Sequence, residues 1–129
     1  MKNQALRALL IVLIGVLVLM GCATVPTEVP EDLSPAELLQ RAQEFADARN
    51  YQAALAYNQA IMDRFPEDRV AYITAQYHRG LFHQRNGDFE IAIDQYEIIL
   101  ARFQAETNLP NWIRVLSERR LEDARQGIR

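Results

Sequence analysis

The side chains that most often carry chemistry are scarce in this chain of 129 residues. Its two histidines, His78 and His83, are five positions apart, which places them about 140° apart on a helix. They therefore do not share the face that an i, i+4 metal pair occupies. A single cysteine, Cys22, leaves no second thiol for a zinc site or an internal disulfide. We predict no metal site.

Residues that could serve as catalytic nucleophiles are also few. The serines are Ser34, at the start of a predicted helix, and Ser117, which has no histidine near it in sequence. The only lysine, Lys2, lies in the first segment, so no lysine remains downstream for a Schiff base or a phosphate loop. The net charge of −3 gives no reason to expect nucleic acid. We predict a protein that is not an enzyme, and a small hydrolase is the least favoured function.

The first segment, residues 1–21, has the pattern of an export signal. Lys2 and Arg7 precede a run from Ala8 to Met20 in which only Gly15 is not apolar. The run is shorter than the roughly 20 apolar residues that a membrane-spanning helix needs.

This run ends in Leu19-Met20-Gly21-Cys22, which resembles the lipobox of bacterial lipoproteins. Leu19, Gly21 and Cys22 match that motif, whereas Met20 departs from its usual small or β-branched residue. The resemblance implies that Cys22 becomes the first residue of the mature chain and carries diacylglycerol and an N-acyl chain, with no other cofactor. Ala23 stands where the inner-membrane retention signal has Asp, which implies the periplasmic face of the outer membrane.

The alternative is an uncleaved signal anchor in the inner membrane, from Ala8 to about Val25. Both interpretations keep the positive charges in the cytoplasm and the remaining chain outside it. Residues 22–33, which contain Pro26 and Pro30, are expected to form an extended tether between the lipid and the domain. An ordered arm packed on the domain is less favoured, because this stretch has no apolar periodicity.

The elements downstream are predicted to be helices. Ser34-Pro35-Ala36-Glu37 combines a capping serine, a first-turn proline and the glutamate of a capping box. Apolar residues then recur at helical spacing until Asn50, and again until Pro66. A shift of 38 residues superimposes residues of matching size, including Ala54 on Ala92, Ile61 on Ile99 and Phe65 on Phe103. A duplicated helix pair is therefore expected.

At these positions the chain resembles the tetratricopeptide repeat (TPR) family. In residues 34–66 the matching positions are Ala42, Tyr51, Ala54 and Pro66. In residues 67–104 they are Gly80, Phe89 and Ala92. One residue in each repeat departs from the family pattern, Asn58 in the first and Gln104 in the second. The resemblance implies an all-α fold, a short TPR-like solenoid of two helical hairpins. A capping helix is expected at residues 108–127, with Trp112 as its buried anchor.

The TPR family binds extended peptides or helices on the concave surface of its solenoid. Carrying those positions across gives Gln43, Asp47, Thr74, Tyr77, Leu81, Gln84 and Arg85 as implied groove residues. Tyr77 and Arg85 are the best anchor candidates, because aromatics and arginine dominate binding hot spots. An equal alternative makes Tyr77 and Leu81 interior residues against the last helix.

Together these features predict a non-enzymatic interaction module that is tethered to the bacterial envelope by its lipid. It would serve as a scaffold or adaptor for other envelope proteins in outer-membrane protein, pilus or cell-wall assembly, and it is most similar to the outer-membrane assembly group. The alternative is a structural or cell-wall-associated lipoprotein without a peptide groove. Two repeats are few for a stable solenoid, so helix 35–48, with Leu38 and Phe45, is expected to be an exposed end that a partner or a second copy of the chain covers.

Overall fold

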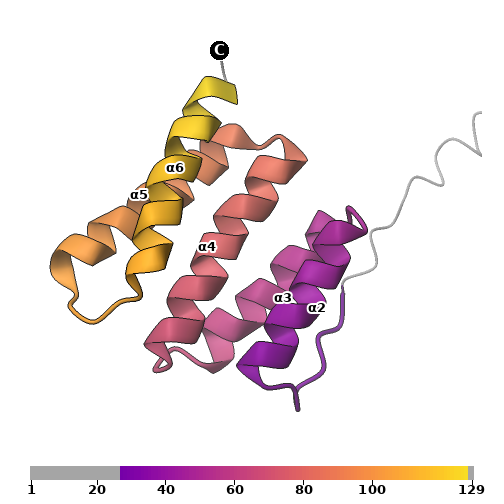
Figure 1. Cartoon of the computed structure of the whole chain (residues 1–129). Helices are drawn as coiled ribbons and strands as arrows, with labels where there is room; N and C mark the ends of the chain where they lie inside the picture. Colours follow the sequence, from indigo (N-terminus) through magenta and orange to yellow (C-terminus); the bar gives the residue numbers. More distant parts are fainter. Residues whose placement is uncertain (1–26, 128–129) are drawn as a thin grey trace, which may run out of the picture.

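The computed structural model describes residues 27–127, which form α-helices and no β-strand (Figure 1). The predicted all-α class is confirmed for this part of the chain. The helices are α2 (Pro35–Asp47), α3 (Tyr51–Arg64), α4 (Arg69–Asn86), α5 (Phe89–Ala105) and α6 (Asn111–Gly127). None of these helices has the length and apolar character that crossing a bilayer requires. The predicted signal segment and Cys22 lie outside the described residues.

The start of α2 confirms the predicted capping box. The Ser34 hydroxyl accepts a hydrogen bond from the Glu37 amide, and the Glu37 carboxylate accepts one from the Ser34 amide at 2.9 Å. Pro35 is the first helical residue. At this position a backbone N–H would have no acceptor within the helix, so proline, which lacks the N–H, costs no hydrogen bond. Asn50, the predicted stop of this helix, acts as the cap of α3 by accepting a hydrogen bond from the Ala53 amide.

The end of α3 and both ends of α4 also have local causes. Helix α3 ends at Arg64, two residues before Pro66, and Asp68 caps α4 by accepting a hydrogen bond from the Ala71 amide. Gly87, after the end of α4, has φ +90°, a left-handed conformation that glycine adopts without strain. Each of these signals lies within a few residues of the boundary that it sets, and Pro66 is the one that the sequence analysis predicts.

Each helix packs mainly against its neighbours in the sequence (Figure 1). Helix α2 lies beside α3, α4 beside α5, and α6 packs on α5. Helix α4 also contacts both α2 and α6, so it is central to the described part of the chain.

The buried residues form two hydrophobic clusters. The first joins α2, α3 and part of α4, and it includes Leu38, Ile61 and Phe82. The second joins α4, α5 and α6, and it includes Tyr96 and Ile113. Leu38 is completely buried, so the expectation that it lies on an exposed helix end is wrong.

Gly80, which matches the TPR pattern in the sequence, lies where two helices approach closely. A Cβ atom at Gly80 would lie 2.8 Å from Cε1 of Tyr96, closer than a side-chain carbon tolerates. The neighbour that requires the glycine is therefore the ring of Tyr96, one turn beyond the fully buried Ala92. The phenol of Tyr96 is fixed in turn by donating a hydrogen bond to Gln84 at 2.9 Å.

Asn58 occupies the position that corresponds to Tyr96 after a shift of 38 residues. It is completely buried, and neither polar atom of its side chain has a hydrogen-bond partner in the described part of the chain. The second helix pair has a buried tyrosine, Tyr96, whose hydroxyl is hydrogen-bonded to Gln84. The first pair has Asn58 at the corresponding position and makes no such hydrogen bond there.

Residues 27–33 form an arm that differs from the free tether expected at 22–33. Val29 and Leu33 pack against the first cluster, and the Arg64 guanidinium donates hydrogen bonds to the carbonyls of Val29 and Pro30. Periodicity did not reveal this contact because an extended segment needs only two well-placed apolar side chains. The last part of the predicted tether is therefore packed on the domain.

Candidate binding groove

A cavity of about 400 Å³ opens between α2, α4 and α6, and we call it the groove. Its walls are formed by Gln43, Asp47, Tyr77, His78, Leu81, Phe82, Arg85, Trp112 and Leu116. Three helices that are distant in sequence thus contribute to one surface.

Five of the seven implied groove residues line this cavity, namely Gln43, Asp47, Tyr77, Leu81 and Arg85. Their spacing of four along α2 and along α4 places them on one face of each helix. The other two lie elsewhere. Thr74 lines a separate cavity of about 270 Å³ with Leu39, and Gln84 is occupied as the acceptor for Tyr96.

Aromatic rings of α4 form the floor of the groove, and one of them contacts Trp112 on the α6 wall. Tyr77 meets Trp112 edge to face, with ring centroids 6.3 Å apart and an interplanar angle of 82°. His78 stacks on Phe82 at 5.9 Å, and its other neighbour is Tyr77 at 5.4 Å. Such contacts hold the rings in fixed orientations and contribute about 0.5–1.5 kcal/mol per pair beyond burial.

Trp112 is not the buried anchor that the sequence suggested. The residue is 48% exposed, whereas its neighbour Ile113 is completely buried. The indole lies on the groove wall because α6 turns Ile113 rather than Trp112 toward the second cluster. Tyr77 is expected to be either a groove residue or an interior residue, and it is both. It is 5% exposed within the second cluster, and it also lines the groove.

His78 brings a buried polar atom to this surface. Its Nε2 lies 3.4 Å from Nε2 of Gln43, and its Nδ1 is buried without a partner in the described residues. Burial, and secondly the charge of Arg85, lower the pKa of His78 to about 4. The imidazole is therefore neutral at physiological pH.

One end of the groove carries two charges. Arg85 and Asp47 lie 3.5 Å apart, and their side chains are 45% and 77% exposed. This separation is longer than the 2.8 Å between Arg125 and Glu97 on the outer surface. A loose and exposed pair costs little to separate, so both charges are available to a bound molecule.

The sequence missed four groove residues: His78, Phe82, Trp112 and Leu116. A signal for the last two was present, because Trp112 and Leu116 follow Tyr77 and Leu81 by 35 positions each. The 38-residue shift that relates the first two helix pairs does not bring them into this alignment. A second, shorter shift would have placed them on the same surface.

The described residues 27–127 contain no group of three or more His, Cys, Asp or Glu side chains close enough to hold a metal ion. The groove instead offers aromatic and aliphatic walls, a few amide and imidazole atoms, and one charge of each sign. Such a lining suits the side chains of a polypeptide.

Comparison with known proteins gives one informative similarity. The chain is 37% identical over 95 residues to an uncharacterized protein of Treponema pallidum (strain Nichols). The match covers 72% of this chain but 38% of that protein, so the chain spans well under half of its relative's length. No protein-family model matches the chain. No solved structure matches it either.

Proposed function

We propose that this protein is a lipid-anchored TPR-like module that holds a segment of another envelope protein in the groove. The observation that carries the proposal is the shared groove, to which α2, α4 and α6 each contribute side chains. A surface built from several stacked helices is how helical repeat proteins bind extended partners.

The TPR-like interpretation is supported by where the repeated residues lie. Ala42 and Gly80, related by the 38-residue shift, are both buried on the first helix of their pair. Tyr51 and Phe89, related by the same shift, are the first residues of α3 and α5. The order of the helices and their packing on sequence neighbours agree with two hairpins followed by a further helix.

The envelope location follows from the sequence of the first segment. The lipobox-like Leu19-Met20-Gly21-Cys22 makes Cys22 the proposed attachment site for the lipid. Ala23 favours the outer membrane, where the domain would face the periplasm. The module acts without chemistry of its own, as a scaffold or adaptor in the assembly of outer-membrane proteins, pili or the cell wall.

A photo-crosslinking amino acid tests the use of the groove. It replaces Arg85 or Gln43 in the full chain, within native membranes, and the control replaces the exposed Ile98 on α5. We expect one discrete crosslinked protein from both groove positions and none from the control. Crosslinks from Ile98 only, or to cell-wall material only, would favour the structural alternative.

A second substitution tests the anchor. Cys22→Ala should abolish lipid attachment, so the chain should no longer be processed at Cys22 as a lipoprotein, and its membrane-bound fraction should fall. Metabolic labelling with a fatty acid provides the readout. A Cys22→Ala chain that still incorporates the fatty acid would contradict the lipid anchor.

A further inference from the structure

The arm, residues 27–33, lies along the α2–α3 pair on the side away from α4 (Figure 1). A cavity of about 420 Å³ separates part of it from the helices. The arm contributes Pro30 and Leu33 to this cavity, and the helices contribute Arg41, Glu44, Phe45, Ala48 and Tyr57. The arm therefore covers the end of the domain where the first helix pair would otherwise meet solvent.

Arg64 is the polar contact that holds this arm. Its guanidinium, at the end of α3, donates to the Val29 carbonyl at 2.9 Å and to the Pro30 carbonyl. Hydrogen bonds from a charged donor are about twice as strong as those between neutral groups. The side chains of Val29 and Leu33 pack on the first cluster. The arm is therefore held by apolar contacts as well as by the hydrogen bonds from Arg64.

The position of this hold sets how far the domain can move from a lipid on Cys22. Seven chain steps from Cys22 to Val29 span at most about 25 Å, whereas twelve steps from Cys22 to Ser34 would span about 40 Å. Holding the arm thus shortens the maximum reach by more than a third. It also makes the chain leave the domain beside α2 and α3, whereas α6 lies on the other side of α4.

We propose that Arg64 fixes the exit point of the chain and so orients the domain on the bilayer, with the α2–α3 end facing the lipid and α6 facing away. This orientation rests on the proposed lipid anchor at Cys22. It would place the α2 wall of the groove nearer the membrane than the α6 wall, so that a partner segment could enter from the membrane side.

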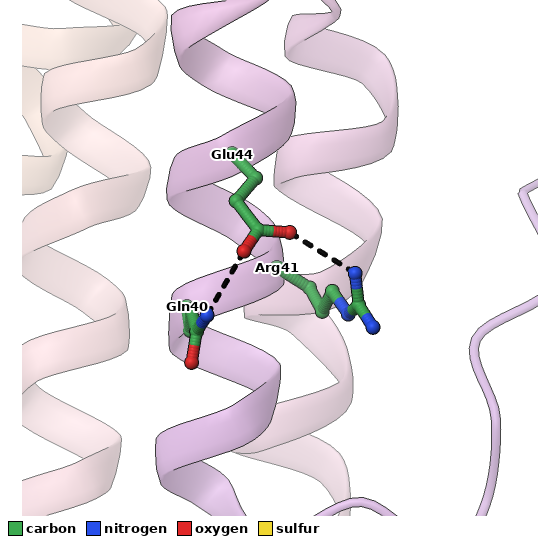
Figure 2. Close-up of polar contacts among 3 residues, drawn as sticks. All are labelled: Gln40, Arg41 and Glu44. Carbon is green, nitrogen blue, oxygen red and sulfur yellow. Dashed lines mark hydrogen bonds and ion pairs between the residues drawn. The ribbon is translucent and has the colours of Figure 1, made fainter.

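The charges at this end favour orientation by the arm rather than by attraction to anionic lipid. Glu44 accepts hydrogen bonds from Gln40 at 2.9 Å and from Arg41 at 3.1 Å, so the positive charge of Arg41 has a carboxylate directly beside it (Figure 2). The arm itself adds the acids Glu28, Glu31 and Asp32. We therefore expect an orientation that does not depend on the lipid charge.

Energy transfer from two labelled positions measures the orientation. The full chain carries a dye on Ala48→Cys, beside the arm, or on Val115→Cys, an exposed position on α6. Each chain is reconstituted in phosphatidylcholine vesicles that contain a headgroup-labelled acceptor lipid. We expect at least twofold stronger transfer from position 48, unchanged by one-fifth phosphatidylglycerol. Equal transfer from both positions, or a difference that appears only with the anionic lipid, would overturn the proposal.

The variant Arg64→Ala tests the role of the residue, with Arg41→Ala as the matched control, because Arg41 lines the cavity under the arm but makes no hydrogen bond to the arm. In Arg64→Ala the difference between the two labels should fall to less than half. Cleavage of the arm after Glu31 by a glutamate-specific protease should become about tenfold faster, since a lost charge-assisted contact favours local opening. Neither readout should change in Arg41→Ala.

The two readouts separate this inference from the anchor. Reaction of the dye with Cys22 would show that the cysteine carries no lipid, which overturns the anchor and the orientation together. The protease assay needs no lipid, so it decides in either case whether Arg64 holds the arm. Equal cleavage rates in Arg64→Ala and in the parent chain would show that it does not.

Discussion

The partly buried imidazole of His78 should make the stability of the protein depend on pH. Its pKa of about 4 in the fold lies below the ordinary value of 6.5, because burial disfavours the charged form. The unfolded chain therefore binds more protons between these two values, so the free energy of unfolding falls as the pH drops through this window. From pH 7 to pH 5 the expected loss is about 2 kcal/mol.

Urea denaturation at pH 7 and at pH 5 measures this loss. In His78→Leu the difference between the two pH values should largely vanish, because the group that titrates has been removed. His83→Gln is the control, since it keeps His78 and should keep the dependence. The same slope in the parent chain and in His78→Leu would assign the pH effect to other groups.

The two serines of the chain should respond in opposite ways to replacement by alanine. Ser34→Ala removes the cap of α2 and should cost about 1 kcal/mol of unfolding free energy. The Ser117 hydroxyl is buried without a hydrogen-bond partner in the described residues, so Ser117→Ala should be neutral or stabilising. Thermal unfolding followed by circular dichroism compares the two variants, and equal losses would contradict both assignments.

At the scale of the helices, the close approach of α4 and α5 depends on Gly80. Gly80→Leu would force a side chain into the ring of Tyr96 and should cost roughly 1–3 kcal/mol. Ala101 is exposed on α5, so Ala101→Leu adds bulk outside the core. This variant should leave stability almost unchanged. Chemical denaturation of both variants distinguishes a packing effect from a general effect of added bulk.

The helix boundaries were predictable because their causes are local. Ser34 and Pro66 act within one turn of the helix ends that they determine. The groove positions on α2 and α4 were predictable too, because helical spacing and the resemblance place Gln43 and Leu81 on the correct faces.

The exposure of Trp112 and the packing of the arm could not be predicted in this way. Both depend on contacts between segments that are distant in sequence. The rotation of α6 is decided by which of two adjacent apolar residues fits the second cluster, and Ile113 occupies it. The arm is held by Arg64, more than 30 positions further along the chain, and no periodic pattern connects the two.

At the scale of the molecule, α6 completes the second cluster. It contributes the buried side chains of Ile113, Leu121 and Ala124. Burying one large aliphatic side chain contributes about 1.5–3 kcal/mol, and whole domains are stable by about 5–15 kcal/mol. A chain that ends after Glu106 should therefore lose cooperative thermal unfolding. Glu97→Gln, which removes only the exposed pairing with Arg125, should cost less than about 1 kcal/mol.

The two clusters have a consequence for how the molecule opens. Helix α4 supplies Ala75 and Phe82 to the first cluster, and Ile73 and Tyr77 to the second. The α2–α3 pair can then detach while α4 stays packed on α5 and α6, and the α5–α6 pair can detach while α4 stays packed on α2 and α3. The two pairs should therefore behave as separate units in hydrogen exchange. We expect the slowest-exchanging amides in α4, and two distinct exchange rates for α2–α3 and for α5–α6. Since residues of α4 form the floor of the groove, opening of either unit would remove a wall and leave that floor in place.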